Sequence, residues 1–434
     1  MNTLFQHVTV VTMDDAQPIL KDAFVAVEGS KITAVSTQAP EGRFDRVIDG
    51  TGRVLMPGLV NAHTHVPMTL LRGYGGGHDL QTWLNDYIFP AEDRLDSRSI
   101  RAGTGLAMAE LIAAGVTSIE DQYYFCEDMI QEILAAGLNA NISRGTTCFQ
   151  ALENPADFPA CQEMRALAEQ YDGYNDGQIK VDVSIHGEYT SFLSPNLWEY
   201  LGRYAADHHL GMHVHISETQ SEHQECLGRH GKTPLQILDQ YGVWDCGRSV
   251  AAHCVWVDQE DMALMAKKNI TCAHNPISNL KLGSGVAPIP GMMKAGVNIA
   301  LGTDGPSSNN NQDLWEEVKL ASMLHGGISH DPMAVTPWEA LKMATVNGAK
   351  ALGRTTGMVR PGYDADLILL DFTRPHLMPC HDVVENLVYA ARGGDVCLTM
   401  ARGQVLYENG VFFTVDLDKI RYEVAHYALP HLFG

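Results

Sequence analysis

Pro57-Gly58-Leu59-Val60-Asn61-Ala62-His63-Thr64-His65 is the stretch from which the fold is predicted, because an apolar run ends there in two histidines. On a β-strand, residues i and i+2 point to the same side, so both imidazoles can face one metal ion. A glycine-rich loop, Arg72 to His78, follows. A buried strand that ends in polar side chains is typical of the rim of a catalytic barrel. A His-x-His pair alone is weak evidence, so the prediction depends on further ligands downstream.

Apolar runs of strand length recur along the chain and alternate with segments of helical periodicity. The eight runs are Leu59–His65, Val116–Asp121, Asn139–Gly145, Val181–Gly187, Met212–Ser217, Val250–Val255, Ile270–Pro276 and Val297–Asp304. The helical segments include Arg101–Ala114, Asp258–Lys268 and Asn311–Leu324. Eight such units predict an α/β fold of the (β/α)8, or TIM-barrel, type. A doubly wound open sheet is the alternative, but no GxGxxG motif opens the first unit.

The two ends of the chain differ from the middle, because they consist of short β-rich runs and tight turns. Glu28-Gly29-Ser30 separates two such runs near the N-terminus, and Asn409-Gly410 is a strong turn signal near the C-terminus. We therefore predict a small β-sandwich domain formed by residues 1–56 and 358–415, a barrel formed by residues 57–357 and a helical tail formed by residues 416–434. Two separate decorations at the edge of the barrel are the alternative.

Composition and net charge argue against several classes of function. The 434 residues are 45% hydrophobic and 19% charged, as in ordinary globular proteins. With 30 Lys and Arg against 52 Asp and Glu, the net charge is −22, which argues against binding to nucleic acid or to anionic membranes. The N-terminus shows no signal peptide, no apolar run approaches the roughly 18 residues of a membrane span, and the nine cysteines form no CxxC pair. We therefore expect a cytoplasmic homo-oligomer that acts on a small-molecule substrate.

Polar side chains stand at the end of each predicted barrel strand, where barrel enzymes build their active sites. In chain order they are His63 and His65, Asp121, Arg144, His186, His215, His253, His274 with Asn275, and Asp304. The histidines at positions 208, 209, 223, 230, 325, 330, 376, 381, 426 and 431 fall on predicted helices, loops or the tail. We interpret these as solvated and without a ligand role.

Four of the strand-end side chains suit one divalent metal ion: His63, His65, His215 and Asp304. Three imidazoles and one carboxylate, with room for water, are typical of catalytic zinc, and iron(II) is the alternative. His213 competes with His215, because the two form a second His-x-His pair. We choose His215 as the ligand because Glu218 follows it by three residues. A carboxylate at that place would lie close to the metal-bound water and could act as general acid and base.

Glu218 and His253 complete the predicted catalytic set with Asp304. Glu218 is predicted to move protons, and a charge at a helix N-terminus is the alternative interpretation. His253 lies at a strand end among small apolar residues, in Ala251-Ala252-His253-Cys254. We predict that it hydrogen-bonds the metal-bound hydroxide; the alternative is a hydrogen-bonded histidine of the core.

Several motifs at these positions are similar to those of one enzyme family. They are the opening stretch, His215-Ile216-Ser217-Glu218-Thr219, Ala251-Ala252-His253-Cys254, Gly302-Thr303-Asp304-Gly305, His274-Asn275-Pro276 and Ser278-Asn279-Leu280-Lys281-Leu282-Gly283. Together they resemble the amidohydrolase superfamily, and more closely its methylthioadenosine/S-adenosylhomocysteine deaminase and chlorohydrolase branch. The resemblance covers nearly the whole chain. It implies a barrel with a β-sandwich made from both termini, one metal, and hydrolytic deamination of an amino-heterocycle.

The resemblance also implies a substrate pocket. Glu92, in Pro90-Ala91-Glu92, would hold ribose hydroxyls, Arg144 and His186 would line the pocket, and Trp83 would cover it. The implied substrate is an adenine nucleoside of the adenosine, 5′-deoxyadenosine, methylthioadenosine or S-adenosylhomocysteine type. Two departures from the family pattern disfavour S-adenosylhomocysteine itself. Residues 145–164 contain no second arginine for its carboxylate, and Glu188 adds a carboxylate near the pocket.

Other functions on the same scaffold remain open. A chlorohydrolase is the nearest, although the retained Glu218 favours deamination. Deamination of a free aminopurine, a pterin or a triazine is a further alternative. Amide or cyclic-imide hydrolysis with two metals would be expected to use a carbamated lysine at the end of the fourth strand, and Val181–Gly187 contains no lysine. A catalytically inactive barrel that serves as a binding subunit is disfavoured, because no predicted ligand or acid–base residue is missing.

Overall fold

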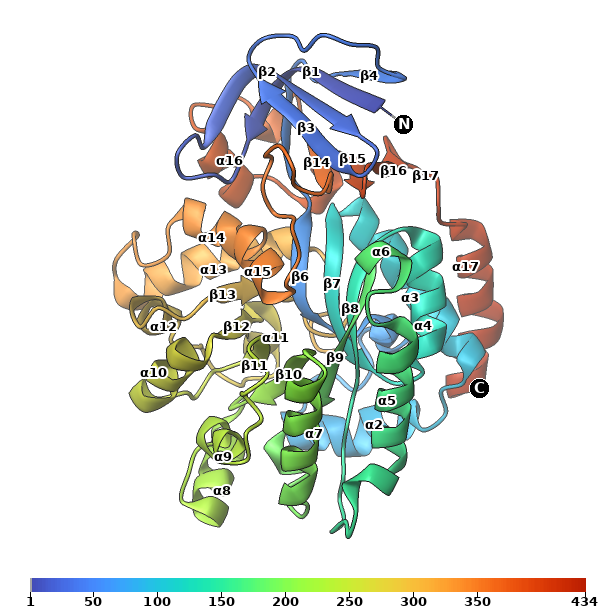
Figure 1. Cartoon of the computed structure of the whole chain (residues 1–434), viewed down its shortest axis with the longest axis vertical. Coiled ribbons are helices and arrows are strands. Elements are labelled where there is room, and N and C mark those ends of the chain that lie inside the picture. Colours follow the sequence, from blue (N-terminus) through green and yellow to red (C-terminus); the bar gives the residue numbers. More distant parts are fainter. Residues whose placement is uncertain (1) are drawn as a thin grey trace.

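The computed structural model describes residues 2–434, and its middle part is a nearly closed barrel of eight parallel strands (Figure 1). Strands that follow one another in the chain are parallel neighbours in the sheet. They are β6 (Leu59–Thr64), β7 (Val116–Tyr123), β8 (Asn139–Arg144), β9 (Ile179–Ile185), β10 (Gly211–Ile216), β11 (Ser249–His253), β12 (Ile270–His274) and β13 (Ile299–Leu301). A bridge between Thr64 and Asp304 links the first strand to the segment after the last. The predicted barrel is confirmed.

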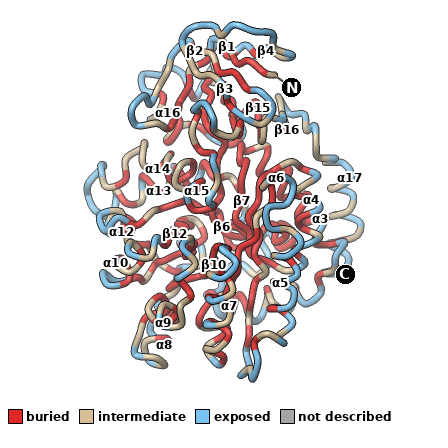
Figure 2. Tube along the Cα trace, viewed as in Figure 1, coloured by how far each residue is buried: buried red, intermediate tan, exposed pale blue. Residues whose placement is uncertain are grey.

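Helices alternate with the strands and surround the barrel (Figure 1). They include α3 (Ser97–Ala113), α4 (Cys126–Ala136), α5 (Pro159–Tyr171), α7 (Pro195–Asp207), α8 (Gln220–His230), α9 (Pro234–Gln240), α10 (Gln259–Lys268), α13 (Leu314–Ser329), α14 (Pro337–Met343) and α15 (Val346–Ala351). The barrel strands are buried along nearly their whole length (Figure 2), since helices cover one face and the barrel interior covers the other. This double burial explains why apolar residues recur along every barrel strand.

Helix α3 shows how a cap moves an element boundary. Apolar periodicity predicts a helix over Arg101–Ala114, but α3 already begins at Ser97. The Asp96 side chain accepts a hydrogen bond from the backbone N–H of Ser99, and Ser99 Oγ accepts one from the backbone N–H of Asp96. This capping box satisfies the first free N–H groups of the helix, so helical structure starts before the apolar pattern does.

The two ends of the chain meet in a second sheet of nine strands. It contains β1 (Asn2–Val11), β2 (Ile19–Glu28), β3 (Lys31–Ser36), β4 (Arg46–Asp49), β5 (Arg53–Pro57), β14 (Leu367–Asp371), β15 (Val396–Ala401), β16 (Gln404–Glu408) and β17 (Val411–Phe412). β5 pairs antiparallel with β14, so N-terminal and C-terminal strands are hydrogen-bonded neighbours. The sheet has its own apolar core, which excludes two separate decorations. The division of the chain into domains at residues 56 and 357 stays a prediction.

The orientation of the barrel follows from its first strand. β5 runs into β6, so the N-terminal ends of the barrel strands face the end sheet, and their C-terminal ends lie on the opposite side (Figure 1). The short helices η1 (Val66–Leu71), α1 (Leu80–Thr82), η2 (Trp83–Ile88) and α2 (Phe89–Glu92) follow the first of these C-terminal ends. Side chains that close the site therefore come from the segment directly after His65.

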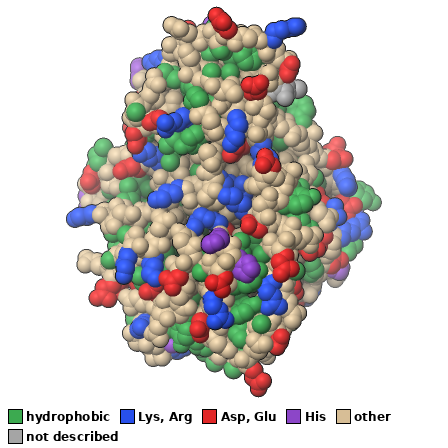
Figure 3. Space-filling model, in the orientation of Figure 1, with side chains coloured by type: hydrophobic (Ala, Val, Ile, Leu, Met, Phe, Trp, Pro, Cys, Tyr) green, Lys and Arg blue, Asp and Glu red, His purple; other side chains and the backbone are tan. Residues whose placement is uncertain are grey.

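The last residues are helical, in α17 (Leu417–Glu423), η7 (Val424–Ala428) and α18 (Leu429–Phe433). α17 packs on α3, outside the barrel (Figure 1). Among the described residues, no helix combines the length and the apolar character that crossing a membrane requires. Acidic and basic side chains are interspersed over the face of the molecule shown in Figure 3.

Candidate active site

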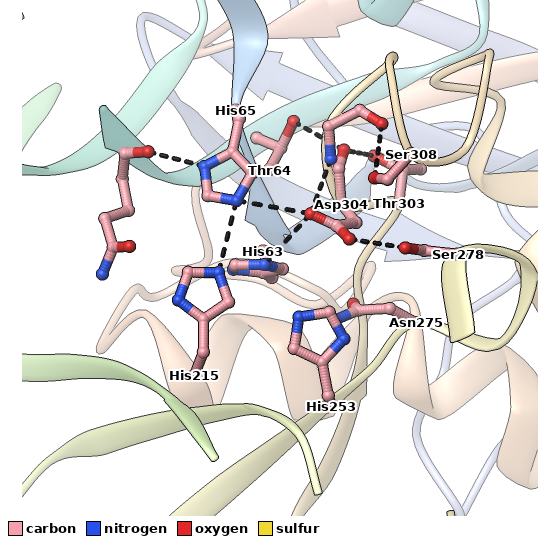
Figure 4. A network of polar contacts seen from close by, with 12 residues as sticks. His63, Thr64, His65, His215, His253, Asn275, Ser278, Thr303, Asp304 and Ser308 are labelled. Carbon is pink, nitrogen blue, oxygen red and sulfur yellow. Dashed lines mark hydrogen bonds and ion pairs between the residues drawn. The ribbon is translucent and has the colours of Figure 1, made fainter. Parts of the chain in front are cut away.

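Three histidines and one aspartate converge at the C-terminal end of the barrel (Figure 4). Asp304 Oδ1 lies 3.4 Å from His63 Nε2 and 3.3 Å from His65 Nε2. His215 Nε2 lies 3.4 Å from His65 Nε2. Four ligands at about 2.05 Å from one metal ion in a tetrahedron are separated by about 3.3 Å. These three spacings therefore match those between neighbouring ligands of one divalent ion, and all four side chains adjoin the same centre.

Hydrogen bonds orient two of these imidazoles toward the centre. His65 Nδ1 donates to the backbone carbonyl of Gln122 at 2.6 Å, and His215 Nδ1 donates to that of His186 at 2.7 Å. A carbonyl only accepts, so each Nδ1 carries the proton and each Nε2 offers a lone pair. Such outer partners are typical of histidines that bind metals.

His63 is oriented by a chain of buried groups beneath the centre. Its Nδ1 lies 2.8 Å from His213 Nε2, and His213 Nδ1 lies 3.3 Å from Glu120 Oε1. His63 Nε2 is buried, and apart from its 3.4 Å contact with Asp304 Oδ1 it has no polar partner, so a bound cation would satisfy it. The structure thus places His215 at the centre and His213 behind His63, and the assignment of His215 as the ligand stays a proposal.

The electrostatics of the centre favour positive charge between Asp304 and the histidines. Burial raises the pKa of Asp304, but the adjacent imidazoles of His63 and His65 outweigh it and hold the pKa well below its usual value. Burial lowers the pKa of His65, but the hydrogen bond and charge of Asp304 prevail and raise it to about 9. Burial lowers the pKa of His63 to about 3, so His63 is neutral and free to act as a ligand.

Glu218 and His253 face the same centre from neighbouring strand ends. Glu218 Oε2 lies 3.7 Å from His253 Nε2, and Ser284 Oγ donates to Glu218 Oε1 at 3.4 Å. His253 Nδ1 bonds to Asn279 Oδ1 at 2.8 Å, which makes Nδ1 the donor and leaves Nε2 toward the centre. Burial raises the pKa of Glu218 above its ordinary value. A carboxyl with a raised pKa beside a histidine is suited to proton transfer near neutral pH.

The loop that carries Glu218 is held by another glutamate. Glu222 accepts hydrogen bonds from the backbone N–H groups of Ser217 and Glu218, and it forms a capping box with Thr219 at the start of α8. The helix N-terminus is therefore capped without Glu218, whose side chain is left to line the cavity. This geometry is against the alternative interpretation of Glu218 as a helix-terminal charge.

Backbone strain gathers at the ends of three strands. Ser217, His253 and Asp304 have φ angles of 48°, 72° and 62°, in the left-handed region that non-glycine residues rarely adopt. Such conformations cost about 1–3 kcal/mol each and are concentrated at functional sites. They turn the chain sharply after each strand, so that Asp304 and His253 face the centre.

A cavity opens above this cluster. Trp83, Glu92 and His186 line it together with His65, His215, Glu218, His253 and Asp304. Tyr123 Oη donates to Glu92 Oε1 at 2.5 Å, and Trp83 Nε1 donates to the carbonyl of Tyr74 at 3.4 Å. The structure therefore brings together every predicted site residue except Arg144, which lines a neighbouring outer cavity.

A model of the amidohydrolase family matches residues 54–406, a range that contains all four candidate ligands, Glu218 and His253. The chain belongs to the amidohydrolase family. It is 37% identical to the 5-methylthioadenosine/S-adenosylhomocysteine deaminase of Thermoanaerobacter pseudethanolicus, with 98% of each chain covered. It is 39% identical to the 5′-deoxyadenosine deaminase of Methanosarcina acetivorans, over 96% of this chain and 95% of that protein.

Solved structures agree with this assignment. An adenosine deaminase from Xanthomonas campestris with bound zinc is 29% identical, with a TM-score of 0.91 over 97% of this chain and 96% of that one. The atrazine chlorohydrolase of Arthrobacter aurescens complexed with zinc is 25% identical, with a TM-score of 0.91 over 97% of this chain and 99% of that one. The family resemblance seen in the motifs is confirmed. This amidohydrolase is a hydrolase of C–N bonds, and its histidine-rich centre is suited to a divalent metal ion.

One carboxylate of the amidohydrolase lies elsewhere than predicted. Glu188 was expected to add negative charge near the substrate pocket, but Arg229 Nη2 donates to its Oε2 at 2.6 Å, and His230 Nε2 lies 2.9 Å from its Oε1. Glu188 is fully buried and is absent from the residues that line the cavity. Its charge is neutralised within the protein, so it does not repel a substrate.

Two of the histidines that were interpreted as solvated are buried. His325 is 3% exposed, and its Nε2 lies 3.2 Å from Nε2 of His274, a predicted strand-end residue. His223 is 6% exposed and bonds to Ser217 Oγ. The interpretation is wrong for both, because the inward faces of α8 and α13 bury them. Tyr189 is a cavity residue that sequence reasoning missed, since an aromatic residue in a loop carries no motif signal.

Proposed function

We propose that this amidohydrolase is a zinc-dependent deaminase that releases the 6-amino group of adenine nucleosides as ammonia. The observation that carries the proposal is the placement of Glu218 and His253 beside the metal-suited cluster, which consists of His63, His65, His215 and Asp304. Glu92 lines the same cavity. The names of the two relatives, a methylthioadenosine/S-adenosylhomocysteine deaminase and a 5′-deoxyadenosine deaminase, support an adenine nucleoside as substrate.

His63, His65, His215 and Asp304 are the residues that would hold the metal ion. Zinc is proposed over iron(II), because three imidazoles and one carboxylate suit catalytic zinc and because both structural neighbours described above contain zinc. When bound, the ion supplies a water molecule whose pKa is lowered to about 7.

The residues of the chain perform the proton transfers. Glu218 accepts a proton from the attacking water and delivers it to the ring nitrogen next to the reacting carbon. His253 Nε2 hydrogen-bonds the attacking oxygen, and Asn279 keeps the ring in this orientation. The water oxygen adds to the carbon that bears the amino group, and the remaining hydroxyl proton passes to the amino nitrogen. The C–N bond then breaks, ammonia leaves, and the ring carbon becomes a carbonyl.

The raised pKa of Glu92 predicts that the enzyme's preference for substrates with an intact ribose depends on pH. Burial raises the pKa of Glu92 to about 7, against the hydrogen bond from Tyr123. Below pH 7 the carboxyl is protonated, whereas above pH 7 it is ionised and accepts from both ribose hydroxyls. The ratio of kcat/KM for adenosine to that for 2′,3′-dideoxyadenosine should therefore rise about tenfold from pH 6 to pH 8, as the ionised fraction does.

The ratio isolates Glu92, because groups that act on the ring affect both substrates equally. In Glu92→Gln the ratio is expected to be low and independent of pH. If the wild type and the variant show the same profile, Glu92 does not contact ribose, and a free base or a pterin becomes the better substrate class.

A substrate panel tests the proposed function directly. We expect the zinc-loaded protein to release ammonia from adenosine, 5′-deoxyadenosine and methylthioadenosine, with lower kcat/KM for S-adenosylhomocysteine and for adenine. Chloride release from a chlorotriazine, without ammonia release from any nucleoside, would instead establish the chlorohydrolase alternative. Lack of bound metal together with lack of turnover would establish the inactive binding subunit.

The assembly and location of the protein also belong to the proposal. We propose a homo-oligomer in the cytoplasm; the location is supported by the cysteines, which are free thiols, as is usual in a reducing compartment. Light scattering on the purified protein measures the oligomeric state.

A further inference from the structure

We infer that an ion pair between Arg144 and Glu163 makes this site select nucleosides whose 5′ substituent is uncharged and apolar, and reject those that carry a carboxylate. The inference rests on the proposed function and specifies its substrate class. It concerns the outer cavity, which is distinct from the cavity above the metal-suited cluster.

The two cavities adjoin, since Phe89, Glu92 and Tyr124 line both. Glu92 is the residue proposed to hold the ribose hydroxyls. A nucleoside with its base over the catalytic cluster and its ribose at Glu92 therefore has its 5′ carbon at the junction. The outer cavity is the space into which a 5′ substituent extends.

The walls of the outer cavity combine apolar surface with negative charge. Its apolar residues include Leu95, Phe125, Phe149 and Leu167. Its acidic residues are Glu92, Asp93, Glu127, Asp128 and Glu163. Among the residues that line it, Arg144 is the one with a positive charge. An anionic substituent could thus be paired in this cavity by Arg144.

Arg144 is already engaged. Its Nε donates to Glu163 Oε2 at 2.7 Å, its Nη1 donates to the carbonyl of Gly145, and its guanidinium lies 5.1 Å from the ring centre of Tyr124. The Arg144 side chain is 18% exposed, whereas that of Glu163 is 58% exposed. Glu163 therefore occupies the Nε edge of the guanidinium, an edge at which a ligand carboxylate would pair.

The negative charge and the apolar surface of the outer cavity together determine which 5′ substituent it accepts. A carboxylate that enters must displace Glu163 from Arg144 and also lie among several other carboxylates, and like charges at short distance repel. An alkylthio or methyl group needs no ionic partner and buries apolar surface against the phenylalanine and leucine side chains.

The test is Glu163→Gln in the full-length, zinc-loaded protein, with methylthioadenosine and S-adenosylhomocysteine as substrates. Releasing Arg144 should raise the ratio of kcat/KM for S-adenosylhomocysteine to that for methylthioadenosine by about 10–100-fold, the contribution of one hydrogen bond to a charged group. Glu127→Gln is the matched control, because it removes one negative charge from the same cavity and leaves the contacts of Arg144 intact. It should change the ratio less than about threefold, since solvent-exposed charges are screened.

An unchanged ratio in Glu163→Gln, or an equal rise in both variants, would overturn the inference. A wild type that prefers S-adenosylhomocysteine to methylthioadenosine would do the same. These results differ from failure of the proposed function, which is absence of ammonia release from every adenine nucleoside by the metal-loaded wild type.

Discussion

His215→Ala is expected to lose the bound metal and the deaminase activity together. His215 Nε2 is one of the ligand atoms of the cluster, and His65 and Asp304 are left with one imidazole fewer around the ion. Because catalytic zinc is held by only three or four protein ligands, loss of one removes a large share of the binding. Metal content by mass spectrometry after gel filtration, and ammonia release measured on the same sample, test this expectation.

His213→Ala is the matched control, since it removes an imidazole from the same strand, two residues away. His213 touches His63 Nδ1 and not the centre, so the variant should retain metal at micromolar protein concentration. Its affinity should fall about 10–100-fold, as is typical when an outer partner of a ligand is lost. Equal metal loss in both variants, or loss only in the His213 variant, would show that the ligand assignment is wrong.

Glu218→Gln is expected to keep the metal and to lower kcat by about 10²–10⁴-fold, the usual contribution of general acid–base catalysis. The amide has the size of the carboxyl but cannot accept and return the proton. Burial of Glu218 next to His253 places it where this transfer is needed. Single-turnover ammonia release with metal-saturated protein measures the effect on the chemical step.

Ser284→Ala provides the comparison for Glu218, because it removes the hydrogen bond to Oε1 and leaves the carboxyl in place. Its effect on kcat should be much smaller than that of Glu218→Gln. If Glu218→Gln lowers kcat by less than about tenfold, the residue has a structural role and another group moves the proton.

Much of the fold could be predicted from the sequence, and for a definite reason. A parallel barrel strand is buried on both faces, so its sequence is a short and largely apolar run. Polar residues near its C-terminal end mark the catalytic end of the barrel. Leu59–Thr64 and Gly211–Ile216 are examples: His63 and His215 are their second-last residues, His65 follows the first of them, and all three lie at the cluster. The observed helix boundaries differ from the predicted ones where a capping residue determines them, as at the start of α3.

Side-chain direction and charge pairing were decided only by the tertiary structure. The sequence contains Glu188 and Arg144 near the ends of strands, but their partners Arg229 and Glu163 lie on helices elsewhere in the chain. Whether a charge faces a cavity or a partner depends on long-range packing, which local periodicity does not encode.

The same holds for the choice between His213 and His215, which share one face of a strand. The sequence determined the barrel, the end at which the site lies, and the residue types of the metal cluster, because these follow from burial pattern and strand geometry. The tertiary structure decided which histidine faces the centre and which supports it, because depth within the barrel and the left-handed turns at Ser217, His253 and Asp304 arise only when the strands close around one another.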